Sequence, residues 1–156
     1  MLYLVRHGKA GSRSDFHGDD RLRPLSPAGY RQAQALADAL VAAGVKTLIS
    51  SPFLRCIETL QPTARAIGAT IVVDNRLAEG RSGVDVLELL AVVDDAAAVC
   101  SHGDVIPETI AALQRRGCEL TSAPDWRKGS VWVLERDAGG EIVSAHAWPP
   151  PDLRST

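Results

Sequence analysis

Cysteine is scarce in this sequence, and its scarcity argues against one class of protein. The chain has three cysteines, at Cys56, Cys100 and Cys118. An odd number of widely spaced cysteines does not fit the disulfide framework of a small secreted domain. Each lies in an apolar or helical segment, so we predict that all of them are buried free thiols.

Long hydrophobic runs and an excess of either charge are also missing. No apolar run approaches the ~20 residues that a membrane-spanning helix needs. Arg6, His7 and Lys9 interrupt the apolar stretch near the start, so no signal peptide is expected. The formal net charge of −2 gives no electrostatic reason to expect nucleic acid or an anionic membrane as a partner. We therefore expect a cytoplasmic protein.

The histidines lack the spacing of metal ligands. His17 and His146 stand far from each other and form no ligand pattern with His7. We expect neither a metal nor a cofactor.

The sequence does contain enough apolar material for one core. It has 156 residues, of which 46% are hydrophobic. A chain of this size can bury roughly 70% of its extended surface. No repeat or linker divides it, so we expect a single domain over residues 1–156.

Predicted strands and helices alternate along the chain. This order predicts an α/β fold, a three-layer sandwich with a mainly parallel central sheet and helices on both faces. A glycine-rich turn at 138–140 predicts a C-terminal β-hairpin. Residues 8–25 read as a long polar loop. The predicted strands are 2–6, 45–50, 69–74 and 96–101, with hairpin strands 130–136 and 141–147; the predicted helices are 27–43, 52–67, 84–90 and 105–116.

Cationic side chains follow the ends of separate predicted strands. Arg6 and His7 end the first strand, Arg55 follows the second, and His102 follows the fourth. In parallel α/β sheets, ligands bind outside the carboxyl ends of the strands. We therefore expect these residues to meet in one anion pocket.

The residue types in this pocket match phosphate chemistry. Arg6 and Arg55 carry planar guanidinium groups, which can form bidentate hydrogen bonds to phosphate oxygens. Clustered arginines should disfavour protonation of His7 and leave its imidazole able to attack phosphorus. His102, facing a bound dianion, is expected as an imidazolium that stabilises developing charge.

A leaving group also needs a proton, and carboxylates near the strand ends are the candidate donors. Glu79, after the third strand, is the best placed. Asp104 is the second choice, and Asp19 or Asp20 in the long loop are weaker ones.

Four segments together resemble the histidine phosphatase superfamily, which includes phosphoglycerate mutases and acid phosphatases. They are Leu4-Val5-Arg6-His7-Gly8, Ser50-Ser51-Pro52-Phe53-Leu54-Arg55, Leu77-Ala78-Glu79 and Ser101-His102-Gly103. Further segments, at 19–26 and 100–107, resemble the short branch of bacterial phosphohistidine phosphatases and the phosphatase module fused behind Nudix domains.

This resemblance implies a metal-independent phosphohydrolase that forms a phosphohistidine intermediate on His7. Arg6, Arg55 and His102 would hold the phosphoryl group, and Glu79 would donate the proton. The substrate would be a phosphohistidine protein or a small phosphomonoester or nucleotide. The alternative is a non-catalytic phosphate-binding module. Possible substrate contacts are Arg21, Arg23 and Gly103.

Overall fold

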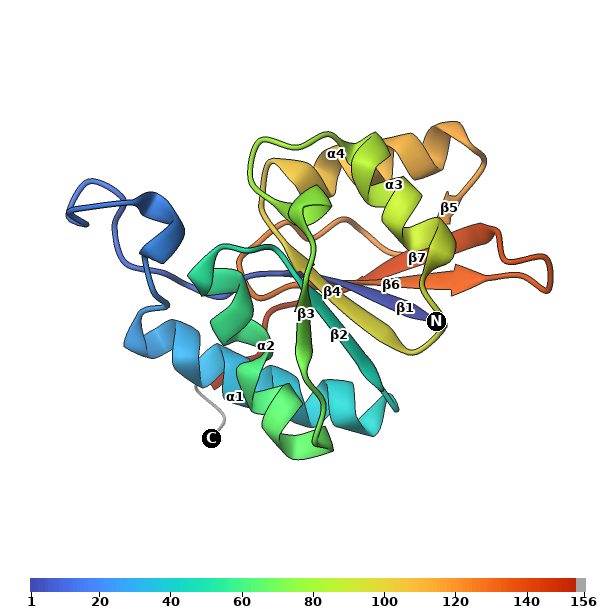
Figure 1. The fold of residues 1–156 in the computed structure, drawn as a ribbon. Coiled ribbons are helices and arrows are strands. Elements are labelled where there is room, and N and C mark those ends of the chain that lie inside the picture. Colours follow the sequence, from blue (N-terminus) through green and yellow to red (C-terminus); the bar gives the residue numbers. More distant parts are fainter. Residues whose placement is uncertain (154–156) are drawn as a thin grey trace.

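Strands and helices alternate through most of the computed structural model, which describes residues 1–153 (Figure 1). The strands are β1 (Leu2–Arg6), β2 (Thr47–Ser50), β3 (Ile71–Val73), β4 (Ala97–Ser101), β5 (Glu119–Leu120), β6 (Val131–Arg136) and β7 (Ile142–Trp148). The helices are α1 (Pro27–Ala42), α2 (Leu54–Ile67), α3 (Gly83–Val92) and α4 (Val105–Arg115), with 3₁₀ turns at Asp20–Leu22 and Asn75–Leu77.

The strands form one sheet in the order β3-β2-β4-β1-β6-β7-β5. Strand β1 pairs in parallel with β4, and β2 pairs in parallel with both β4 and β3. Strands β6 and β7 form the antiparallel hairpin, which joins the sheet through β1. The predicted α/β fold with a mainly parallel sheet and a C-terminal hairpin is therefore confirmed. The short β5, which pairs with β7, was not predicted.

Helices cover both faces of the sheet because its central strands are apolar on both sides (Figure 1). On β1, Leu2 and Leu4 face the core that includes α3 and α4. Tyr3 and Val5 face the other core, which includes α1 and α2. Side chains alternate along a strand, so one short segment contributes to two cores. The predicted burial of the three free cysteines is also confirmed. No helix in residues 1–153 is long and apolar enough to span a membrane.

The two Ser-Pro segments behave differently. Ser26 caps α1 as predicted, its hydroxyl accepting from the Gly29 N–H at 3.2 Å, with Pro27 as the first helical residue. The prediction that Ser51-Pro52 begins the next helix is wrong by two residues, because α2 begins at Leu54. The Ser51 side chain has another partner, described below.

The polar loop between β1 and α1 projects from the carboxyl end of β1 (Figure 1). It is more ordered than predicted, because a bridge joins Ala10 to Leu25 and Asp20–Leu22 forms a 3₁₀ turn. The loop also lies directly against α1. A Cβ at Gly29 would sit 1.9 Å from the Lys9 carbonyl oxygen, so this close approach requires glycine.

Candidate active site

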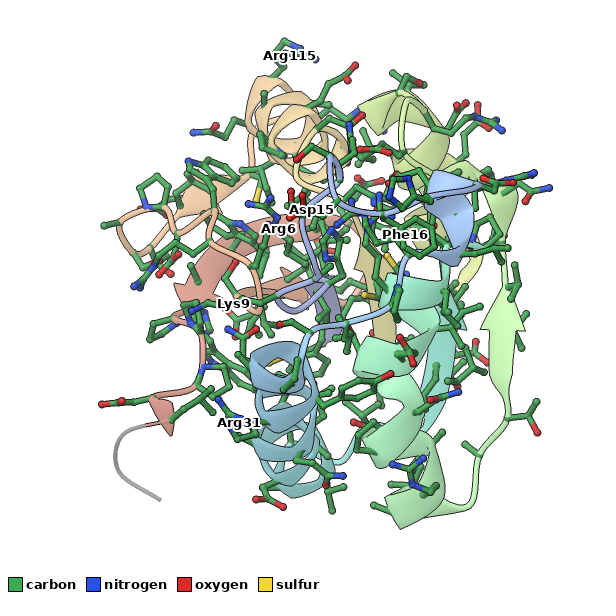
Figure 2. The ribbon with its side chains drawn as sticks, turned by 90° about the vertical axis from the view of Figure 1, so that its left-hand side faces the viewer. Arg6, Lys9, Asp15, Phe16, Arg31 and Arg115 are labelled. Carbon is green, nitrogen blue, oxygen red and sulfur yellow. The ribbon has the colours of Figure 1, made fainter. Side chains whose placement is uncertain are left out.

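The carboxyl ends of β1 and β4 and the start of α2 surround one cavity of about 360 Å³. Figure 2 faces the side from which the loop projects, with Arg6 near the centre of the view. The cavity is lined by Arg6, His7, Ala10, Gly11, Ser12, Arg13, Arg23, Arg55, Glu79, His102, Gly103, Asp104 and Lys128. The structure therefore brings together the cationic residues that follow three different strands.

His7 follows β1 and is buried, with 5% of its surface exposed. Its Nδ1 lies 2.8 Å from the Gly8 carbonyl oxygen, which can only accept, so Nδ1 carries the ring proton. The Nε2 lone pair is then free for a substrate. The ring lies 5.4 Å from that of His102, edge to face.

Burial is the main reason why the pKa of His7 falls to about 3. The bond to Gly8 opposes this shift, whereas the charges of His102, Arg55 and Arg6 add to it. The predicted direction is confirmed, but arginine repulsion is only a minor cause. His7 is therefore neutral near pH 7, the form in which an imidazole is a nucleophile.

We expect the lowered pKa of His7 to make the folded protein less stable in acid. Because the folded pKa of about 3 lies below the ordinary 6.5, the unfolded chain binds the extra proton between these values. The contribution of His7 to the unfolding free energy is fully present above pH 6.5 and is lost as the pH falls toward 3. From pH 7 to pH 4, the wild type should lose about 3 kcal/mol more unfolding free energy than His7→Gln. Urea denaturation at both pH values measures this difference, and parallel losses in the two proteins would refute it.

Arg6, at the end of β1, lies against the backbone of Gly103. A Cβ at residue 103 would be 2.6 Å from the guanidinium carbon of Arg6, so only glycine leaves room for this arginine. Arg6 donates from Nη1 to the Trp126 carbonyl oxygen, whereas its buried Nε has no partner among the described residues. Burial lowers the pKa of Arg6, partly offset by Asp104.

Arg55, in the first turn of α2, is 1% exposed. Its Nη1 donates to the Asp20 carbonyl oxygen at 2.9 Å, and its Nη2 lies 3.2 Å from carboxylate oxygens of both Asp20 and Glu79. The guanidinium also packs over the Phe53 ring, 4.9 Å from its centroid. These contacts hold the guanidinium group of Arg55 at the cavity.

His102 follows β4, and one of its ring nitrogens already has a protein partner. Its Nε2 lies 2.8 Å from the Ser51 hydroxyl and 3.6 Å from the Cys56 sulfur, neither of which lines the cavity. Its buried Nδ1 has no partner in residues 1–153. If the Ser51 hydroxyl donates to Nε2, the ring proton sits on Nδ1, where it can be donated to a bound anion. The imidazolium form of His102 stays a prediction.

Removal of the Ser51 hydroxyl should therefore disturb His102. We expect Ser51→Ala to lower kcat about tenfold, because His102 loses the bond that orients its ring. Ser50→Ala is the matched control. Ser50 is equally buried, but its hydroxyl donates only to the Ser51 carbonyl oxygen, so kcat should change less than about twofold. Equal losses in both variants would argue against a specific role for Ser51.

The candidate proton donors line the cavity as hydrogen-bond acceptors. Glu79 accepts from Arg13 at 2.7 Å and from Arg55 at 3.2 Å. Asp104 accepts from the Gly80 N–H at 2.8 Å. Asp20, a weaker candidate in the sequence, instead joins Arg55 to Arg23.

The remaining predicted contacts separate into two groups. Arg23 is buried, lines the cavity and donates to Asp20 at 2.8 Å. Arg21 does not line the cavity; it is exposed and pairs with Asp19 at 2.6 Å. Sequence reasoning missed Arg13 and Lys128, because an isolated charge in a polar segment looks the same as a solvated one.

Comparison with known proteins identifies the family. The family model described as histidine phosphatase superfamily (branch 1) matches residues 2–88, more than half of the chain. The chain belongs to this superfamily. The match includes His7, Arg55 and Glu79, and it ends before His102.

The curated relatives of this chain carry the names of different enzymes. The 8-oxo-(d)GTP phosphatase of Mycolicibacterium smegmatis is 36% identical over 97% of this chain and 48% of its own length. A Proteus mirabilis protein assigned as phosphoglycerate mutase GpmB is 36% identical over 54% of this chain and 40% of its own. The chain thus spans about half the length, or less, of these curated relatives.

The superfamily fold is also seen in solved structures. A Nakamurella multipartitia protein assigned to phosphohistidine phosphatase SixA superposes with a TM-score of 0.76 at 26% identity. The match covers 97% of this chain and 96% of that chain. It agrees with the predicted α/β sandwich fold and with the resemblance to phosphohistidine phosphatases.

Proposed function

We propose that this histidine phosphatase hydrolyses phosphorylated substrates through a phosphohistidine intermediate on His7. The observation that carries the proposal is the geometry of the cavity. A neutral imidazole, held by the Gly8 carbonyl oxygen, shares one cavity with Arg6, Arg55 and His102. This set of groups suits a dianionic phosphoryl group, and it leaves one nitrogen lone pair free for attack.

In the proposed reaction, His7 Nε2 forms a bond to phosphorus while the bond from phosphorus to the leaving group breaks. Arg6, Arg55 and the His102 Nδ1–H stabilise the charge on the phosphoryl oxygens. Glu79, or Asp104 as the second choice, protonates a leaving group that needs a proton. Water then hydrolyses the phosphohistidine, which releases inorganic phosphate and restores neutral His7.

The proposed substrates are a phosphohistidine protein or a small phosphomonoester or nucleotide. Phosphatase names among the relatives support an enzyme rather than the non-catalytic phosphate-binding alternative. We also propose that residues 1–156 form one domain of this superfamily, and that the chemistry needs no metal.

A substrate panel tests this proposal. It should contain a phosphohistidine protein, nucleotides, sugar phosphates and p-nitrophenyl phosphate, each assayed with and without EDTA. We expect phosphate release from at least one class, unchanged by EDTA. Release that requires a metal would contradict the mechanism, and no release from any class would contradict the function.

A further inference from the structure

The cavity can hold more than the transferred phosphoryl group. Its volume of about 360 Å³ falls in the range of roughly 300–1,000 Å³ that is typical of pockets for small organic ligands. At Lys128 it adjoins a second groove of about 710 Å³, which Lys128 also lines. A substrate bound at His7 therefore has room to extend past Lys128.

Within the described part of the chain, some of the cationic side chains that line the cavity pair with carboxylates, and Lys128 does not. Arg13 pairs with Glu79 and Asp20, and Arg23 pairs with Asp20. Lys128 has no carboxylate within ion-pair distance in residues 1–153. Burial and the neighbouring arginines lower its pKa, since a cation there lies among other cations. An anion beside Lys128 would remove this repulsion.

The backbone of Lys128 is fixed relative to the proposed nucleophile. Buried Gln32 donates from Nε2 to the Lys128 carbonyl oxygen at 3.2 Å and accepts the Lys9 N–H at 2.8 Å. The Gly129 N–H donates to the His7 carbonyl oxygen at 3.1 Å. Figure 2 labels Arg6, the last residue of β1, and Lys9, on the segment that follows β1. Lys128 is exposed, whereas Arg55, His7 and His102 are buried, so Lys128 lies at the cavity mouth.

We propose that Lys128 forms a second anion subsite, which holds another phosphate of the substrate beside the phosphoryl group that His7 accepts. The ligand class is the phosphoanhydrides, such as nucleoside diphosphates and triphosphates. This inference deepens the proposed function and rests on it. Lys128 then contacts the part of the substrate beyond the transferred phosphoryl group.

Such a substrate can react without a proton donor from the protein, because its leaving group departs as an anion. His7 Nε2 bonds to the terminal phosphorus, the bond from that phosphorus to the bridging oxygen breaks, and the shortened phosphate chain leaves with the electron pair as an anion. Water then converts the phosphohistidine to inorganic phosphate and neutral His7. Both carboxylate oxygens of Glu79 accept from arginines, and Asp104 accepts from Gly80, so a leaving group that departs as an anion fits this site.

Binding of two small anions tests the subsite without turnover. Titration calorimetry compares orthophosphate with methylenediphosphonate, a non-hydrolysable diphosphate analogue. In wild type the diphosphonate should bind about fivefold or more tightly than orthophosphate, since it reaches one additional cation. Lys128→Gln should lose this preference and keep its affinity for orthophosphate.

Arg81→Gln is the matched control, because Arg81 is an exposed cation that pairs with Asp85 and lines neither the cavity nor the second groove. It should keep the wild-type preference for the diphosphonate. Unchanged binding in Lys128→Gln, equal losses for both anions, or an equal loss of preference in the control would each overturn the subsite. If the panel above shows no turnover while this binding pattern holds, the phosphatase function fails and the subsite stands.

Discussion

Replacement of His7 by alanine should abolish turnover and leave the fold intact. His7 is the group with a free nitrogen lone pair in the cavity, and removal of a catalytic nucleophile costs about 10⁴-fold or more in kcat. The one described hydrogen bond of its side chain is to Gly8, and the backbone bonds of residue 7 remain in the variant, so loss of the imidazole should cost only about 1 kcal/mol of stability. The measurement is phosphate release from the best substrate of the panel, beside a thermal unfolding curve.

The unfolding curve separates chemistry from structure in this experiment. If His7→Ala unfolds near the wild-type temperature and is inactive, the loss belongs to the missing imidazole. If it retains more than about 1% of the wild-type rate, another group is the nucleophile and the proposed mechanism fails.

Arg55→Ala should produce the second-largest effect, on activity and stability together. Loss of one preorganised donor to a developing oxyanion typically costs about 10²–10³ in kcat. In addition, Asp20 and Glu79 would lose a buried cationic partner, for which we expect a cost of about 2 kcal/mol, because both carboxylates remain partly solvated. Steady-state kinetics and urea denaturation measure the two effects.

Two further arginine variants define what Arg55 contributes. Arg55→Lys keeps the charge but loses the planar fork, so it should remain at least about tenfold below wild type. Arg21→Ala removes an exposed arginine that pairs only with Asp19, and it should leave both activity and stability unchanged. Full activity in Arg55→Lys would show that charge alone suffices there.

The architecture was predictable because local patterns and topology agree. Apolar strands that alternate with amphipathic helices imply a parallel sheet, and the capped start of α1 at Ser26 is visible in the sequence. The start of α2 was not predictable. The Ser51 hydroxyl bonds to His102, which lies 51 residues away, and no local rule anticipates that partner.

The placement of the candidate site was also predictable, because carboxyl ends of parallel strands meet at one edge. Arg6, His7, Arg55 and His102 do line one cavity. Their electrostatics were less predictable, since burial dominates the pKa of His7 and burial is a tertiary property. The role of Asp20 in joining Arg23 to Arg55, like the position of Lys128, depends on how the loops pack.

The central claim is that His7 carries the phosphoryl group during turnover. Rapid quench of the protein with ³²P-labelled substrate, followed by peptide mapping, tests it most directly. The account predicts an acid-labile, base-stable label on the peptide that contains His7, and no label in His7→Ala. A label on any other residue, or turnover without a labelled protein, would contradict it.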